Sequence, residues 1–313
     1  MRVGLAGRSR SRLGAVRSQL PVGAHGWALI EADSEDADSI AALAAGTRVL
    51  FTTVGHIRNT DYLSSMPARG PVLTTPTSRV RCRSSGRRSI AATLSPGRAG
   101  ARIVHSCGYD SVPSDLAVLL LHQAAEADGA GGLVEVQLVA TAKAGISGGT
   151  LESMRGQLDA MRSSTALRSL AADLYALNPD RIREPTTQQP LDAGPVRRSD
   201  DGTWTAPFIM APFNTRIVRR SNALQGWAYG RALQYGEVMA FAPTRRVLDR
   251  SLPAPGAGPS AGTQRAGWFH SQVTARTEDG HRYQAIAAGP GDPGYAATAV
   301  LGGRNRTRSR PRR

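Results

Sequence analysis

Short apolar runs alternate with helical patterns over the first 55 residues. The runs at 2–6, 27–31 and 49–54 have the length of buried strands, and the last is rich in β-branched residues. The stretches 10–20 and 34–45 between them favour helices, and Ser34 is a candidate N-cap for the second. This strand–helix alternation, with a spacing of about 25 residues, predicts a doubly wound α/β sheet.

The alternation stops after Gly55 and resumes near residue 102. Residues 56–100 show neither a helical nor a strand period and mix proline, glycine, serine and arginine. A strand is expected at 102–106, followed by a helix at 113–127 with Pro113 in its first turn. Beyond it the pattern predicts a half-solvated strand at 133–142, two helical segments within 150–175, strands of an antiparallel layer at 208–210, 235–241, 268–276 and 283–288, and a Pro/Gly linker at 252–263.

These elements predict an α/β protein with two domains and a tail. We expect an incomplete Rossmann-like, doubly wound parallel sheet in residues 1–115, with its first strand missing. Residues 116–301 are expected to form an α+β domain for substrate binding or oligomerisation, with a mixed or antiparallel sheet. Residues 302–313 are expected to be a disordered basic tail.

The net charge of +15 suggests at first a nucleic-acid binder, but the charge is confined to two segments. Residues 56–102 hold nine arginines against one aspartate, and residues 304–313 hold six arginines and no acid. The remainder of the chain is nearly neutral, and neither basic segment shows helical spacing or interleaved aromatic residues. We therefore expect no nucleic-acid partner, and keep nucleic-acid binding as the least favoured alternative.

From cysteine content and hydropathy we expect a cytoplasmic protein, at most peripheral to the inner face of the plasma membrane. Cys82 and Cys107 do not make a disulfide framework in a chain of 313 residues. No run approaches the roughly 20 apolar residues of a transmembrane helix. The first residues have no apolar stretch of signal-peptide length.

A dinucleotide site is expected at the carboxyl ends of the three N-terminal strands. Gly7, Arg8 and Ser9 end the first strand, and Arg12 follows one helical turn later. An arginine there can pair with the 2′-phosphate that distinguishes NADP from NAD, and Ser9 can donate a hydroxyl. Asp33 follows the second strand and can accept from an adenine amine.

The third strand end adds two candidate cofactor residues, but all these positions also have a simpler interpretation. Thr53 and Gly55 would allow the backbone to approach a ribose or phosphate closely. The alternative is that Arg8 and Arg12 are a solvated helix start and that Gly55 is an ordinary turn. The residues alone favour this alternative.

A second polar motif, residues 107–115, follows a predicted strand and opens a helix. A nicotinamide ring and a substrate would meet at such a place, where Gly108 permits close approach and Asp110 and Ser111 offer polar groups. The motif is equally well explained as a helix cap built on Ser111 and Pro113. No cluster of residues in the sequence has metal-ligand spacing, so no metal is expected.

Two further motifs each have two interpretations. Residues 147–150 (SGGT) precede a helix and suit either an anion site or a plain cap. Arg216, Arg219 and Arg220 share a helical spacing that suits a face meeting an acyl-carrier partner or acidic lipid heads. A solvated helix face is the favoured interpretation of these arginines.

Six segments resemble the saccharopine-dehydrogenase-like oxidoreductases, in particular the trans-acting enoyl reductase family of mycobacterial type. The segments are AGRSRSRL at 6–13, TTVG at 52–55, ARIVHSCGYDSVPSDLAVLLLH at 101–122, SGGT at 147–150, PFIMAPFNTRIVRRSNAL at 207–224 and AGPGDPGYAATAV at 288–300. The resemblance implies an NADPH-dependent enoyl reductase that acts with a polyketide synthase on lipid precursors, as in phthiocerol and phenolic glycolipid assembly. Enoyl reduction needs a proton donor, for which Tyr109 is the candidate and water the alternative.

The chain departs from this family in several places, which leads us to expect an impaired copy or a non-catalytic remnant that only binds a partner. Relatives begin with a strand and a Gly-rich turn for the pyrophosphate, and no such element precedes Arg2. After Gly55, relatives resemble Gly-Pro-Tyr-Thr-x-Tyr-Gly-Leu. A codon choice for residues 55–62 exists that spells Pro-Tyr-Thr-Gln-Tyr-Gly-Leu in a shifted frame, so we expect a frameshift there that ends near Ala101. A similar origin is expected for 302–313, and a shortened helical stretch between Ala242 and Leu252.

Overall fold

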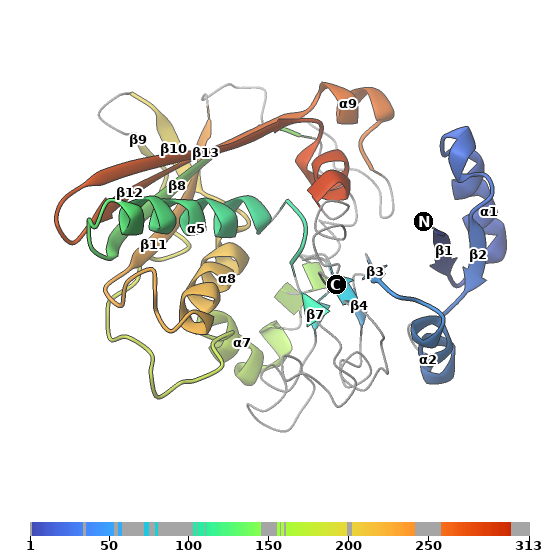
Figure 1. Ribbon diagram of the computed structural model, residues 1–313, viewed down its shortest axis with the longest axis horizontal. Coiled ribbons are helices and arrows are strands. Elements are labelled where there is room, and N and C mark those ends of the chain that lie inside the picture. Colours follow the sequence, from blue (N-terminus) through green and yellow to red (C-terminus); the bar gives the residue numbers. More distant parts are fainter. Residues whose placement is uncertain are drawn as a thin grey trace. The chain divides into compact units, whose positions relative to one another are not determined.

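The chain folds into two compact units, residues 1–105 and residues 106–308 (Figure 1). The structure, a computed structural model, describes residues 2–33, 36–52, 56–57, 72–74, 79–80, 103–104, 106–109, 111–144, 155–156, 158–159, 161–198, 202–241 and 258–301.

The first unit opens with a parallel strand–helix–strand motif. Strand β1 (Gly4–Gly7) pairs in parallel with β2 (Ala28–Glu31), and the register joins Gly4 to Ala28 and Gly7 to Glu31. Helix α1 (Arg10–Ser18) and the short helix η1 (Val22–Ala24) form the connection between the two strands. These elements confirm the N-terminal part of the predicted pattern.

Helix α2 (Ala37–Ala45) follows, and its start differs from the prediction. Its N-cap is Asp36, whose carboxylate accepts the backbone N–H of Asp38 at 3.0 Å. Ser34, the predicted cap, lies outside the described residues. Aspartate and serine cap equally well, so the sequence could not distinguish these two neighbouring candidates.

The remaining strands of the first unit are short and parallel. Strands β3 (Leu50–Thr52), β5 (Val72–Thr74) and β7 (Ile103–Val104) form one sheet, while β4 (His56–Ile57) pairs with β6 (Arg79–Val80). The parallel strands described in the first unit therefore lie in three separate sheets. The prediction of no regular structure within 56–100 is wrong at β4, β5 and β6, because two or three strand residues are too few to show a period.

The second unit is built on one mixed six-stranded sheet in the order β13-β12-β8-β11-β10-β9. Its central strands β8 (Leu133–Lys143) and β11 (Gln234–Phe241) are parallel to each other. The outer pairs are antiparallel and involve β9 (Arg197–Arg198), β10 (Trp204–Pro207), β12 (Trp268–Thr277) and β13 (Arg282–Pro290). The α/β class and the mixed sheet are confirmed, but β8 belongs to this same sheet and not to a separate layer.

Two predicted boundaries in the second unit are wrong. Residues 208–210 form a turn after β10, in which Phe208 O accepts the N–H of Ala211 at 2.9 Å, and not a strand. A short apolar run does not distinguish a strand from the approach to a helix. Residues 261–263, expected in a linker, begin helix α9 (Ala261–Ala266), which Ser260 caps.

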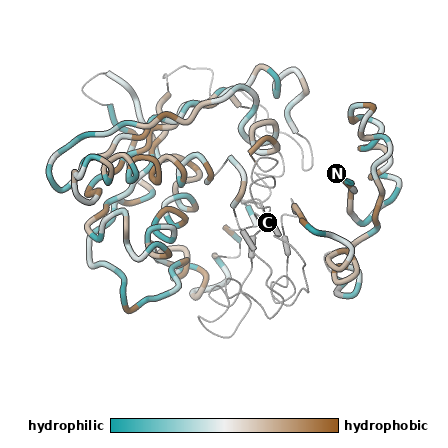
Figure 2. The backbone as a smooth tube through the Cα atoms, in the orientation of Figure 1, coloured by the Kyte–Doolittle hydropathy of each residue, from teal (hydrophilic) through white to brown (hydrophobic). Residues whose placement is uncertain are grey.

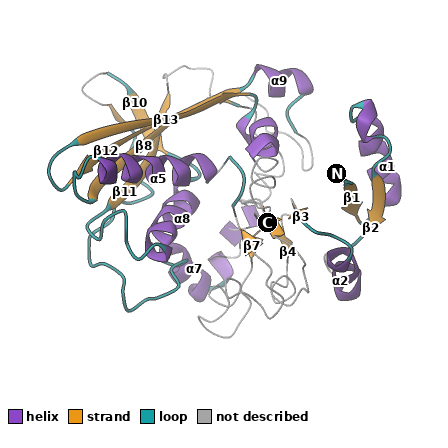
Figure 3. Ribbon diagram, viewed as in Figure 1, coloured by secondary structure: helices purple, strands orange, loops and turns teal. Residues whose placement is uncertain are grey.

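Helices α5 (Val112–Ala127) and α8 (Ala211–Leu224) cover one face of this sheet (Figures 1 and 3). Hydrophobic positions lie along α5 and the neighbouring strands (Figure 2). The fully buried side chains of this core include Val118, Leu133, Leu138, Val218 and Val273. Helix α7 (Thr165–Ala172) and the π-helical turn η3 (Pro293–Ala297) complete the unit.

Candidate functional site

The carboxyl ends of β1 and β2 bring five of the predicted cofactor residues to one edge. Gly7 ends β1 and accepts the backbone N–H of Ala32 at 3.1 Å, so Arg8 and Asp33 leave neighbouring parallel strands at the same edge. Arg8 is exposed and Asp33 is half-buried. The sequence prediction for this edge relied on strand ends alone, and the register of the two strands agrees with it.

Helix α1 begins at this edge with an exposed, positively charged first turn. Ser9 is its N-cap, and the Ser9 hydroxyl accepts the backbone N–H of Arg12 at 3.3 Å. No acidic residue lies in this turn, and Arg12 is exposed. A helix N-terminus with neighbouring arginines favours phosphate, so the charge of this turn fits a phosphorylated dinucleotide. The other two predicted residues, Thr53 and Gly55, lie outside the described residues.

In the second unit, the loop 106–109 before α5 is buried. Cys107, Gly108 and Tyr109 are all buried, and Tyr109 is 8% exposed. The Tyr109 ring packs edge-on against Phe269 with ring centroids 4.8 Å apart, and its backbone N–H donates to Thr298 Oγ1 at 3.1 Å. These contacts fix the loop against β12 and the chain after η3. Asp110 and residues 147–150 lie outside the described residues.

Ser111 stands at the N-cap position of α5, but its side chain does not cap the helix. Its hydroxyl donates instead to Asn214 Oδ1 at 3.1 Å, and Ser111 is only 1% exposed. The interpretation of Ser111 as a side-chain cap is therefore wrong, because a buried amide on α8 competes for the hydroxyl. Pro113, at the start of the helix, has no N–H that would need a cap.

The Ser111 hydroxyl is one end of a buried chain of hydrogen bonds that the sequence analysis missed. Asn214 Nδ2 donates to Glu237 Oε2 at 2.9 Å, and the Tyr235 hydroxyl donates to Glu237 Oε1 at 2.6 Å. Asn214, Tyr235 and Glu237 come from α8 and β11 and are each at most 5% exposed. The only sequence signal for these hydrogen bonds was Glu237 itself, a glutamate among the apolar residues of a central strand.

Burial shifts the ionisation of two carboxyls in this region. Burial raises the pKa of Glu237 from its usual 4.5 to about 7, although hydrogen bonds from Tyr235, Ser114 and Asn214 oppose the shift. Burial likewise raises the pKa of Asp115 to about 6, against a hydrogen bond from Ser221. Carboxyls with such pKa values can hold a proton near neutral pH, beside the loop predicted to meet the substrate.

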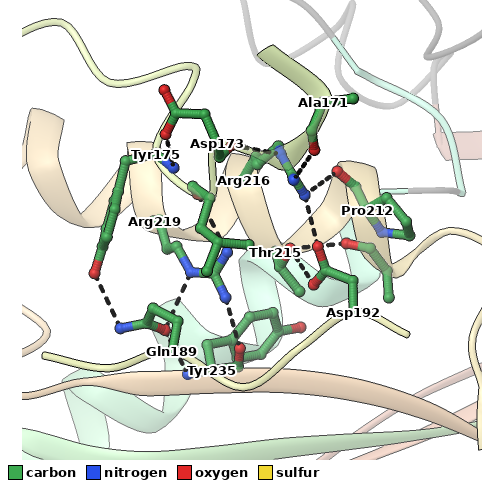
Figure 4. A network of polar contacts seen from close by, with 12 residues as sticks. Ala171, Asp173, Tyr175, Gln189, Asp192, Pro212, Thr215, Arg216, Arg219 and Tyr235 are labelled. Atoms are coloured by element: carbon green, nitrogen blue, oxygen red, sulfur yellow. Dashed lines mark hydrogen bonds and ion pairs between the residues drawn. The ribbon is translucent and has the colours of Figure 1, made fainter. Parts of the chain in front are cut away.

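The arginines of α8 form a buried cluster, shown in Figure 4. Arg216 and Arg219 are 8% and 3% exposed, so both sequence interpretations, a solvated face and a partner-binding face, are wrong for them. Arg216 donates to the carbonyls of Ala171 and Asp173 and forms an ion pair with Asp192 at 2.7 Å. Arg219 donates to Leu174 O, Gln189 Oε1 and Tyr235 O.

These guanidinium groups explain why charged residues lie in the core. The chain after α7 presents carbonyl groups outside helices and strands, and three arginines of α8 donate to them, including Arg220 to Leu177 O. The helical spacing of arginines in the sequence does not distinguish side chains that face solvent from side chains that donate to buried backbone carbonyls. The cluster is structural and leaves the loop 106–109 and Glu237 as the candidate reactive region of the second unit.

Comparison with known proteins identifies the family. A trans-acting enoyl reductase of Mycobacterium tuberculosis is 38% identical over 338 residues, which cover 96% of this chain and 80% of the relative. Proteins of the same name from Mycobacterium bovis and Mycobacterium ulcerans are 35% identical over 346 and 348 residues, with the same coverage. No protein-family model and no solved structure matches the chain.

The chain therefore belongs to the trans-acting enoyl reductase family. The aligned regions are longer than the chain itself, so the relatives carry residues that it lacks. Among the described residues, no helix is both long and apolar enough to cross a membrane. Nor does the described part of the chain hold a group of three or more residues suited to a metal ion.

Proposed function

We propose that this protein is an NADPH-dependent enoyl reductase of the saccharopine-dehydrogenase-like type, which reduces acyl intermediates of complex lipid synthesis. The observation that carries the proposal is the parallel pairing of β1 and β2, since it brings Arg8, Ser9 and Asp33 to one edge beside the start of α1. Membership of the enoyl reductase family supports the reaction class.

In this proposal two segments of the chain have separate tasks. Residues 1–115 hold the cofactor in a Rossmann-like arrangement, with Arg8 and Arg12 on the 2′-phosphate. Residues 116–301 form the substrate or oligomerisation domain. Gly7, Thr53, Gly55 and Gly108 allow the backbone to approach the dinucleotide closely. Asp33 accepts from the adenine amine.

Bound NADPH supplies the hydride for the β-carbon of an enoyl thioester. The proton for the α-carbon comes from the Tyr109 hydroxyl or from water. Tyr109 is held for this role by Phe269 and by the bond from its backbone N–H to Thr298. Ser111 keeps the loop in place through Asn214, and Asp110 is the further polar group of the motif.

The relatives' name, trans-acting enoyl reductase, supports a proposal for the partner and substrate. Acting in trans requires a separate synthase that presents the acyl chain, and we propose a polyketide synthase of phthiocerol or phenolic glycolipid type. A cytoplasmic location at the inner face of the plasma membrane suits such a substrate. We also propose that this copy is impaired, because residues 56–100 depart from the family's pattern.

The substitution Tyr109→Phe tests the reaction assignment, since it removes the hydroxyl and keeps the ring against Phe269. With crotonyl-N-acetylcysteamine as the thioester, wild-type protein should oxidise NADPH, and Tyr109→Phe should lower turnover about a hundredfold without changing NADPH affinity. Unchanged turnover would assign the proton to water. Saturable NADPH binding with slow turnover would support an impaired enzyme, whereas no NADPH binding at all would favour the partner-binding remnant.

A further inference from the structure

A pocket of about 420 Å³ lies in the second unit, and its lining includes neither the loop 106–109 nor Glu237. One wall comes from the chain after α7 and the other from the C-terminal end of α8 and the turn that follows it. The lining residues are Pro179, Asp180, Arg183, Ala223, Gly226, Trp227 and Arg231. This volume is within the range of small-molecule sites.

The first wall is fixed by the arginines of α8. Arg216 and Arg219 bind the carbonyls of Asp173 and Leu174, and Arg220 binds that of Leu177, two residues before the pocket begins. Within the wall, Arg181 forms ion pairs with Asp173 at 2.8 Å and with Glu184 at 3.1 Å. The wall therefore needs little ordering when a ligand binds, which favours affinity.

The second wall contains an unusual backbone. Trp227 has φ of +69°, directly after Gly226 at +68°, and a large side chain rarely adopts this conformation. The Trp227 N–H donates to Asn222 O at 2.8 Å, and its ring meets Tyr175 edge-on at 6.4 Å. The contacts of the Trp227 ring with Tyr175 and Arg231 hold the indole in the wall. A Cβ at Gly226 would meet nothing within 4 Å, so the space above this residue is open.

The charge of the pocket favours an anion. The Arg231 guanidinium lies 5.7 Å from the centre of the Trp227 ring and donates to Arg183 O at 3.2 Å, and no ion pair among the described residues involves it. Arg183 forms a surface ion pair with Asp180 at 3.4 Å, and the Arg183 side chain is 78% exposed. Arginine has five N–H donors, so both side chains retain donors for a ligand.

The end of α8 would repel an anion if its carbonyls were free. The N–H groups of Gln225 and Gly226 bind the carbonyls of Ser221 and Ala223, and the Trp227 N–H binds that of Asn222. The two arginines therefore set the local field, with Asp180 as the one carboxylate of the lining.

We propose that this pocket binds a phosphorylated small molecule. Its phosphoryl group lies between the Arg183 and Arg231 side chains, where guanidinium forks match phosphate oxygens. A planar or apolar body contacts Pro179, Ala223 and Trp227, and Asp180 accepts from a hydroxyl or amine of that body. Neither the family's name nor the proposed NADPH site accounts for such a pocket.

Calorimetric titration of the full chain with AMP, pyrophosphate and adenosine tests this site. AMP should bind to one site and pyrophosphate to the same site more weakly, while adenosine should bind at least tenfold more weakly than AMP. Arg231→Ala and Arg183→Ala should each weaken AMP binding about tenfold, because each removes charge-assisted hydrogen bonds. Arg183 is exposed, so its variant should keep the wild-type melting temperature.

Two control variants separate this pocket from the proposed cofactor site. Arg282→Ala removes an exposed arginine of β13 and should leave AMP binding unchanged. The double variant Arg8→Ala/Arg12→Ala should also bind AMP as wild type does, even if it loses NADPH. The proposal is overturned if AMP does not saturate, if both pocket variants bind it normally, or if only the double variant loses it.

Discussion

At the scale of single residues, Glu237 is the most unusual group of the second unit. Its carboxyl accepts hydrogen bonds from Tyr235 and Asn214 in a site where the residue is 5% exposed. Burial raises its pKa to about 7 nevertheless. The folded chain therefore binds a proton at this site at a pH at which the unfolded chain has released it.

The substitution Glu237→Gln should remove part of the pH dependence of stability. A raised pKa means that the contribution of Glu237 is complete below pH 4.5 and is lost as the pH rises to about 7, at up to about 1.4 kcal/mol per pH unit. The free energy of unfolding, measured with urea between pH 5 and 8, should thus fall less steeply with rising pH for Glu237→Gln than for wild type. The control Glu135→Gln breaks an exposed pair with Arg276 and should keep the wild-type dependence of stability on pH. If Glu237→Gln also kept that dependence, the assignment of the shift to Glu237 would be wrong.

The buried arginine cluster gives a second prediction. Asp192→Ala should lower the free energy of unfolding by about 3 kcal/mol, because Arg216 loses its counter-charge in a site where both side chains are at most 12% exposed. The matched substitution Asp159→Ala breaks the exposed pair with Arg162 and should cost less than about 0.5 kcal/mol. Equal effects in urea unfolding would mean that the buried pair is no stronger than a surface pair.

At the scale of elements, the turn between α8 and β11 depends on Gly230. Its φ is +130°, and a Cβ there would lie 2.5 Å from Leu133 O on β8. Gly230→Ala should therefore destabilise the chain by about 3 kcal/mol or more, from both strain and overlap with backbone. Gly129, after α5, also has positive φ but open space around a Cβ. Gly129→Ala should cost only about 1 kcal/mol, and thermal melts compare the two.

Most elements of the second unit could be predicted from sequence because their patterns are long. The helix at 112–127 and the strands at 133–143, 268–277 and 282–290 each span nine or more residues. The strand at 234–241 is almost as regular. The sequence could not show that β8 and β11 pair in parallel within one mixed sheet, since pairing depends on partners far apart in the chain.

The candidate site was only partly predictable for a related reason. Arg8 and Asp33 could be placed because each lies two residues after the end of a predicted strand. Glu237 and Asn214 could not, because their hydrogen bond joins β11 to α8 across the core. The same long-range packing explains why Ser111 binds Asn214 and does not cap its own helix.

At the scale of the whole molecule, the two units differ in charge and in the size of their apolar core. The first unit contains the arginine-rich stretch 56–102, and the tail at 304–313 holds most of the remaining excess charge. The second unit contains the large apolar core. We propose that the edge formed by Arg8, Ser9 and Asp33 in the first unit binds NADPH.

Fluorescence titration with NADPH and NADH tests this directly, because it measures the affinity for each cofactor. Wild-type protein should bind NADPH saturably and more tightly than NADH, because Arg8 and Arg12 pair with the 2′-phosphate. Arg8→Ala/Arg12→Ala should weaken NADPH binding at least tenfold and leave NADH binding unchanged, while Arg282→Ala changes neither. Equal affinity of wild type for the two cofactors, or no saturable binding of NADPH, would contradict the account.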